Sequence, residues 1–270
     1  MLADLTVAAV QLTSTQDVEK NLSKSVSWVR RAAQHGAALI VLPENYGFLG
    51  RDEEKLQHAH SIEDGSFTAP LRSLAKELSV HILAGSIPET GPDAQHTYNT
   101  SVLIGPKGET AAIYRKVHLF DVDLADGTQL QESASVAPGD TAVVSNVKGW
   151  TVGLSVCYDL RFPEYYRALL NQQAQILTVP AAFTLHTGKD HWDVLLRARA
   201  IENQCYVIAS GQFGHHGDKR SSWGKSQIID PWGTVLAMAP EREGFTMASL
   251  NASDQQRVRR ELPCLGHRRF

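Results

Sequence analysis

The chain has 270 residues and a formal net charge of −3, with hydrophobic residues at 43% and charged residues at 20%. This length and composition are typical of a globular protein with its own core, and they exclude extensive disorder. The near-neutral charge provides no broad basic surface, so we expect no nucleic-acid partner. The longest apolar run, residues 37–42, is far shorter than a bilayer span, so we expect no membrane segment.

Two further features of the sequence concern the compartment. The N-terminus lacks the basic region and cleavage site of a signal peptide. Cys157, Cys205 and Cys264 are too few for a disulfide framework, and their odd number is typical of a reducing environment. We therefore expect a cytoplasmic protein.

Predicted strands and helices alternate along the chain. A buried strand at 5–12 precedes a helix at 18–34, whose apolar residues recur on one face and which Gly36 can end. Further strands are expected at 38–42, 81–86, 100–104, 110–115, 151–156, 176–179, 206–210, 226–229 and 234–238. Further helices are expected around 67–78, from Pro163, at 191–204 and at 253–262. This alternation predicts the α/β class.

The sequence contains one weak internal similarity. Residues 34–43 and 172–180 both read as a helix end, an apolar strand and a proline, which predicts two related halves facing one another. No composition shift or flexible linker divides the chain, so residues 1–270 are expected to form a single domain. The polar segment 121–135 is a candidate active-site loop.

Cys157 is a candidate nucleophile. It follows the predicted strand 151–156 and precedes a helix, and open α/β sheets place their sites at the carboxyl ends of strands. A helix N-terminus also stabilises a thiolate. The alternative is a buried structural cysteine, a role that fits Cys205 better because Cys205 lies inside an apolar run.

Three charged residues are further candidates for the site, and two of them lie at the ends of predicted strands. Glu44 follows the strand 38–42 and can serve as a general base or as an exposed turn acid. Lys116 ends the strand 110–115, where a lysine can hold an oxyanion or point into solvent. Glu132, taken alone, passes for a surface acid.

The sequence does not indicate a metal or nucleotide site. His58 and His60, and the adjacent His215 and His216, lack further ligands at zinc spacing, and the cysteines form no C-x-x-C. No G-x-G-x-x-G follows a strand and no P-loop occurs. We therefore expect no cofactor.

Three segments carry a resemblance to a known family. They are LPEN at residues 42–45, YRKVHL at 114–119 and SVCYDLRFPE at 155–164. Together they resemble the nitrilase (carbon–nitrogen hydrolase) superfamily, whose catalytic residues are Glu, Lys and Cys in that chain order. The resemblance implies a four-layer α-β-β-α sandwich and a homodimer, with the segment at about 250–270 at the subunit interface.

The resemblance also implies roles for individual residues. Glu44 becomes the general base, Lys116 the oxyanion stabiliser, Cys157 the nucleophile and Glu132 a second glutamate that orders the lysine and the substrate. The Tyr158 backbone N–H is expected to join Lys116 at the oxyanion. The implied reaction is amide hydrolysis through a thioester, without a metal or organic cofactor.

Finer matches indicate a branch of the superfamily. They are CYDLRFPE at 157–164, HWDVLLRARAIE at 191–202, QCYV at 204–207 and HRR at 267–269. This branch hydrolyses the 2-oxoglutaramate-type amide of deaminated glutathione, and an ω-amidase acting on 2-oxoglutaramate is the alternative. Arg161 is the candidate cation for the 2-oxo acid carboxylate, or else an ion-pair partner that holds the turn.

The remaining expectations concern substrate contacts and rival functions. Phe183 and Thr184 match a position in the pocket wall of the family, and ordinary packing is the alternative. The basic loop 214–220 offers groups that can bind a terminal carboxylate, and a solvated loop is the alternative. The partner is expected to be a small-molecule amide. The rivals are an N-acyltransferase of the same superfamily and a non-catalytic binding protein that keeps the fold.

Overall fold

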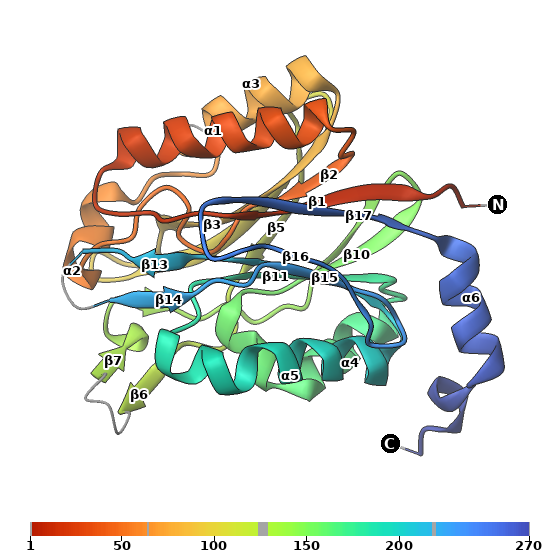
Figure 1. The fold of residues 1–270 in the computed structure, drawn as a ribbon. Helices are drawn as coiled ribbons and strands as arrows, with labels where there is room; N and C mark the ends of the chain where they lie inside the picture. Colours follow the sequence, from red (N-terminus) through yellow and green to blue (C-terminus); the bar gives the residue numbers. More distant parts are fainter. Residues whose placement is uncertain (1, 64, 124–128, 218–219, 270) are drawn as a thin grey trace.

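Two β-sheets lie face to face between two layers of helices in the computed structural model, which describes residues 2–63, 65–123, 129–217 and 220–269 (Figure 1). The first sheet has the strand order β17-β1-β2-β3-β4-β5, with β8 beside β4, and the second has the order β16-β15-β12-β11-β10-β9. Helices α1 and α3 pack on the first sheet, and α4 and α5 pack on the second. The four-layer α-β-β-α sandwich is therefore confirmed.

The bounds of these elements are as follows. The first sheet contains β1 (Leu5–Gln11), β2 (Leu39–Val41), β3 (His81–Thr90), β4 (Thr97–Ile104), β5 (Thr110–Arg115), β8 (Val136–Ala137) and β17 (Gly244–Leu250). The second contains β9 (Val144–Val147), β10 (Trp150–Leu154), β11 (Ile176–Ala181), β12 (Tyr206–Gly211), β15 (Gln227–Ile229) and β16 (Val235–Met238). The helices are α1 (Val18–Gln34), α2 (Asp52–Lys55), α3 (Thr68–Leu78), α4 (Pro163–Asn171), α5 (Leu185–Asn203) and α6 (Ala252–Glu261).

Each sheet is built around three parallel strands. In the first sheet β1, β2 and β3 are parallel, and in the second β10, β11 and β12 are parallel. Such strands are buried on both faces, which explains their unbroken apolar runs. The similar segments 34–43 and 172–180 supply β2 and β11, which are the central strands of the two triplets. The two halves inferred from the sequence are thus present.

Several elements differ from the sequence prediction. Strand β17, which pairs antiparallel with β1, was not predicted. The segment 121–135 is not irregular, because β6 (Asp121–Asp123) and β7 (Gln129–Gln131) form a hairpin there, although residues 124–128 lie outside the described part. The segment 213–223 likewise contains the paired strands β13 (Phe213–His215) and β14 (Ser221–Trp223). Both hairpins are short and polar, so neither shows the alternation that marks a half-buried strand.

Helix α5 begins six residues before the predicted start at His191, at Leu185. The predicted start was late because Thr187 and Gly188 are weak helix formers. Gly188 has a packing role instead, since a Cβ at this position would lie 2.4 Å from the Cβ of Trp223. No helix in the described part of the chain is both long and apolar enough to cross a bilayer.

Gly85 in β3 lets the segment between β2 and Glu44 lie close against the backbone of β3. A Cβ at Gly85 would lie 1.8 Å from the Pro43 carbonyl oxygen and 2.7 Å from that of Leu42. The register of β3 with β4 shifts between Ala84 and Ile87, so the strand is irregular at the same place. The approach therefore requires a residue without a side chain.

We predict that Gly85→Ala lowers the free energy of unfolding by about 1–3 kcal/mol, because a rigid backbone carbonyl blocks the added methyl group. Urea denaturation measures this change. Gly244→Ala is the matched control, since a Cβ at Gly244 meets nothing within 4 Å. Equal loss of stability in the two variants would contradict the packing argument.

Candidate active site

The four residues expected to carry the chemistry converge on one cleft of about 1200 Å³. Glu44 follows β2 after two residues, and Lys116 follows β5 directly. Glu132 begins a short 3₁₀ helix after β7, and Cys157 begins another after β10. Each of the four is no more than 8% exposed. Segments far apart in the sequence therefore bring two carboxyl groups, an ammonium group and a thiol into one buried cluster.

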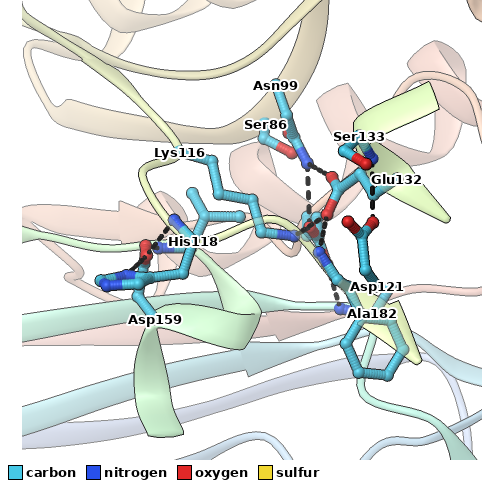
Figure 2. A network of polar contacts seen from close by, with 12 residues as sticks. Ser86, Asn99, Lys116, His118, Asp121, Glu132, Ser133, Asp159 and Ala182 are labelled. Atoms are coloured by element: carbon cyan, nitrogen blue, oxygen red, sulfur yellow. Dashed lines mark hydrogen bonds and ion pairs between the residues drawn. The ribbon is translucent and has the colours of Figure 1, made fainter. Parts of the chain in front are cut away.

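Lys116 lies at the centre of this cluster. Its Nζ donates to Glu44 Oε1 at 3.0 Å and to Glu132 Oε2 at 2.8 Å (Figure 2). Burial opposes the charged form of the lysine, but the Glu132 and Glu44 carboxylates outweigh it and raise the pKa of Lys116 well above its ordinary value. The side chain is therefore a fixed ammonium ion.

Asn99 joins the two glutamates from the other side. Its Nδ2 donates to Glu44 Oε1 and to Glu132 Oε1, both at 3.0 Å (Figure 2). Glu132 Oε2 also accepts the Phe120 backbone N–H at 2.7 Å. Burial opposes the ionised form of Glu132, but Lys116 and then Lys55 counteract it, and the pKa of Glu132 is lowered. Sequence analysis missed Asn99, since nothing near it in the sequence sets it apart from an ordinary strand residue.

Cys157 has an unusual backbone. Its φ of 49° lies in the left-handed region, which non-glycine residues rarely adopt and which is frequent at functional sites. The predicted strand 151–156 ends earlier than expected, at Leu154. The Val156 N–H turns away from the sheet to donate to Asp159 Oδ2 at 2.7 Å, which starts the sharp turn that presents the thiol.

The resting state of the Cys157 thiol differs from the expectation based on a helix N-terminus. Burial, followed by the negative charge of Glu44, raises the pKa of Cys157 well above its ordinary value, although Lys116 acts in the opposite direction. The thiolate is therefore not stabilised in advance. Glu44 is the group placed to take the thiol proton, because its side chain hydrogen-bonds the thiol and its Oε2 accepts the Ala182 N–H at 2.8 Å.

Asp159 connects the turn of Cys157 to the segment of Lys116. Its Oδ1 accepts His118 Nδ1 at 2.8 Å and the His118 N–H at 3.2 Å (Figure 2). Its Oδ2 accepts the Tyr114 hydroxyl at 2.7 Å. Asp159 is fully buried, and the His118 ring stacks on Phe162 with centroids 3.7 Å apart. These residues lie within the motifs at 114–119 and 155–164, but the motifs alone predict no role for them. The position of Asp159 two residues after Cys157 was the available signal.

The four residues predicted to bind substrate lie together, but mainly in a second, smaller pocket. Tyr158, Arg161, Phe183 and Thr184 line this pocket with Cys157, and Thr184 also lines the large cleft. The Arg161 guanidinium lies 5.0 Å from the Phe183 ring centroid and 5.9 Å from that of Tyr158. Its Nη1 is 3.2 Å from Nδ1 of His191. Cys157 thus stands between the two pockets.

The basic loop 214–220 contributes in part to the large cleft. His216 and Arg220 line it, whereas His215 is exposed and residues 218 and 219 lie outside the described part. His216 is buried between the Ser14 carbonyl at 2.9 Å and the Ser222 hydroxyl at 2.8 Å, and burial lowers its pKa to about 4. His216 is therefore neutral near pH 7. Within the described residues, no cluster of three or more His, Cys, Asp or Glu residues is arranged to hold a metal ion.

We predict that Glu44→Gln lowers the pKa of the Cys157 thiol, because the change removes the neighbouring negative charge. Lys116→Met should raise it, since Lys116 favours the thiolate. The pH dependence of iodoacetamide labelling, followed at Cys157 by mass spectrometry, measures both. A shift in the same direction in the two variants would contradict the opposing electrostatic roles.

Known proteins resemble this chain over nearly its whole length. The carbon–nitrogen hydrolase family matches residues 6–260. The deaminated glutathione amidase of Synechocystis is 46% identical over 266 residues, covering 97% of each chain. The deaminated glutathione amidase of Homo sapiens is 43% identical over 268 residues, covering 97% of this chain and 82% of the human protein.

A solved structure shares the fold. The crystal structure of Saccharomyces cerevisiae Nit3, described as a member of branch 10 of the nitrilase superfamily, superimposes with a TM-score of 0.90 at 29% identity, covering 99% of this chain and 97% of Nit3. The resemblance inferred from the three sequence motifs is therefore confirmed. The chain belongs to the carbon–nitrogen hydrolase family.

Proposed function

We propose that this protein is an amidase that hydrolyses the amide of deaminated glutathione through a thioester on Cys157. The observation that carries the proposal is the buried cluster in which Lys116 bridges Glu44 and Glu132 beside the thiol. The substrate follows from relatives of that name at 41–46% identity. Both the nucleophile and a preorganised cation are available in one cleft.

The first half of the reaction uses Glu44, Cys157 and Lys116. Because the thiol is protonated at rest, Glu44 takes its proton as the sulfur attacks the amide carbonyl carbon. The Lys116 ammonium and the Tyr158 backbone N–H stabilise the oxyanion that develops on the carbonyl oxygen. Glu44 then returns the proton to the departing amine as the carbon–nitrogen bond breaks, and the thioester remains.

The second half reuses the same groups. Glu44 removes a proton from a water molecule, which attacks the thioester carbonyl and releases the acid and the thiol. Glu132 is a positioning residue, since it holds Lys116 at 2.8 Å and also accepts the Asn99 amide and the Phe120 N–H. A fixed ammonium requires no reorganisation when the oxyanion forms.

The smaller pocket supplies the proposed contacts to the acyl part of the substrate. Arg161 is the cation for the 2-oxo acid carboxylate, because a guanidinium grips a carboxylate through two parallel hydrogen bonds. The guanidinium lies near the rings of Phe183 and Tyr158, and Thr184 lines both pockets. The pocket would have to widen to admit the acyl chain.

An ω-amidase acting on 2-oxoglutaramate is the second candidate, since both substrates share the 2-oxo acid. A parallel assay of deaminated glutathione, 2-oxoglutaramate, glutamine and N-carbamoyl-β-alanine separates these functions. We expect the highest kcat/KM for deaminated glutathione. A higher value for 2-oxoglutaramate would assign the chain to the ω-amidase branch, and transfer of the acyl group to an added amine in preference to water would indicate an acyltransferase.

We predict that Cys157→Ala lowers kcat by at least about a thousandfold, because the variant lacks the nucleophile. Unfolding should remain close to that of the wild type, since the change removes one sulfur atom beside an open cleft. Cys264→Ala is the matched control, because Cys264 is partly exposed and lies outside the cleft. Undiminished turnover by Cys157→Ala would rule out the thioester mechanism and the catalytic role of this residue.

We further propose a cytoplasmic homodimer. Three free cysteines, two of them buried, suit a reducing compartment. Helix α5 exposes Val194 at 65% and Ile201 at 48%, two turns apart on one face. Trp232, which precedes the Gly233 that lies against Ile201, is 61% exposed. Adjacent exposed apolar side chains of this size are typical of subunit contacts. The segment at about 250–270 is proposed to extend the interface.

We predict a mass near twice the 29.6 kDa of one chain in solution, measured by light scattering at micromolar concentration. Ile201→Asp should shift the protein toward the monomer, because it places a charge in the apolar contact. Ile113→Asp, at a 38% exposed position in β5, controls for a charge added elsewhere. A monomeric wild type, or a dimer that Ile201→Asp leaves intact, would contradict the proposed surface.

A further inference from the structure

The large cleft has an uneven distribution of charge. Beside the catalytic Glu44, Glu132 and Lys116, the described residues that line it include four cations and no other carboxylate. These cations are Arg51, Lys55, Lys189 and Arg220, here called the cationic rim. Among the described residues of the lining, cations therefore outnumber carboxylates, although the chain as a whole carries a net charge of −3.

Three separate segments build the cationic rim. Arg51 immediately precedes α2 and Lys55 is its last residue, Lys189 lies in the second turn of α5, and Arg220 immediately precedes β14. Figure 1 places α2, β13, β14 and the start of α5 at the same end of the sandwich. Arg220 donates to the Gly50 carbonyl at 3.1 Å, which links the loop to the segment that precedes α2. The tertiary structure therefore holds these cations around one opening.

The members of the cationic rim differ in their surroundings. Arg51 pairs with Glu54 at 2.6 Å, and the Lys189 ammonium is 3.9 Å from Asp190, both at exposed positions where ion pairs are weak. Lys55 is only 8% exposed and is close enough to Glu132 to lower the pKa of that carboxyl. Lys55 is thus a buried cation that lines the cleft and acts on the catalytic cluster.

The size of the cleft indicates the kind of ligand. Its volume of about 1200 Å³ exceeds the roughly 300–1,000 Å³ typical of small-molecule sites. A primary amide releases ammonia, which needs neither this space nor a cation. A substituted amide whose nitrogen carries a short peptide needs both, because the peptide ends in a carboxylate.

We infer that the cationic rim binds the carboxylate of the amine leaving group, with Lys55 and Lys189 as residues that select an anionic leaving group over a neutral one of the same size. The inference rests on the proposed function and extends it from the acyl side to the leaving group. Deaminated glutathione has one carboxylate on each side of the reacting amide. Cys157 correspondingly stands between Arg161 in the smaller pocket and the cationic rim in the large cleft.

The test compares deaminated glutathione with the same compound amidated at its C-terminal carboxylate. The two compounds share the acyl group and the reacting bond and differ only in the charge of the leaving group. We expect the wild type to favour the free acid by about tenfold or more in kcat/KM, mainly through KM, and this preference should shrink as salt is added because salt screens charge interactions.

Substitutions in the cationic rim should remove the preference. Lys55→Met keeps the length of the side chain without its charge, and we expect it to reduce the ratio to about threefold or less. Lys55→Arg should restore part of the ratio. Lys189→Met, at an exposed position, provides a second variant whose folding does not depend on a buried side chain. Lys107→Met, in the exposed turn between β4 and β5, is the control for loss of a lysine elsewhere and should keep the full ratio.

The outcomes separate this inference from the proposed function. Equal turnover of the free acid and its amide by the wild type would overturn the inference while leaving the amidase intact. A ratio that persists in both Lys55→Met and Lys189→Met would also overturn it. Hydrolysis of neither compound would overturn the proposed function itself.

Discussion

The buried ammonium of Lys116 is the interaction on which the site depends. An ammonium ion with 2% exposure would be strongly disfavoured alone, and it is stable because the carboxylates of Glu44 and Glu132 lie 3.0 and 2.8 Å away. The dependence is mutual, since both glutamates are buried as well and need the lysine and the Asn99 amide as donors. Removing any one of these charges leaves another without compensation, so the cluster behaves as one unit.

This cluster also determines the protonation state of the proposed nucleophile, Cys157. The same Glu44 that stabilises Lys116 raises the pKa of Cys157, so the thiol stays protonated until a substrate arrives. A protonated thiol is less exposed to oxidation than a free thiolate. In the proposed reaction the thiol loses its proton to Glu44 only during the attack, so no permanent thiolate is needed. Such a reaction requires a general base in contact with the nucleophile, and Glu44 meets this requirement.

Hydrogen bonds and packing around the cluster fix the segments of Cys157, Lys116 and Glu44 relative to one another. Asp159 accepts hydrogen bonds from Tyr114, His118 and Val156, and thereby fixes the turn of Cys157 against the segment that carries Lys116. Glu44 is fixed independently, through the Ala182 N–H of the second sheet and the close approach of Pro43 to Gly85. The reacting groups therefore come from both sheets, and the packing of one sheet on the other sets their mutual distances.

The sequence by itself determined the α/β class, most of the strands and helices, and the residues proposed to react. Helix 18–34 was predicted with the bounds of α1, because a strong apolar face and a glycine mark it locally. Glu44, Lys116 and Cys157 were identified because each ends or follows a recognisable strand and matches a family motif. These features are formed by neighbouring residues in the sequence, so they can be recognised without the tertiary structure.

Only the tertiary structure decided how those residues act on one another. Asn99 and Lys55 have no distinctive neighbours in the sequence. Asn99 donates to Glu132 and Glu44, 33 and 55 positions away, and Asp159 accepts from Tyr114, 45 positions away. Lys55 acts on Glu132 from another part of the cleft wall. The helix N-terminus after Cys157 favours a thiolate, but burial and the charge of Glu44, more than a hundred positions earlier in the chain, raise the pKa of the thiol. Hydrogen bonding and electrostatics at a buried site depend on distance in space, which a linear sequence does not contain.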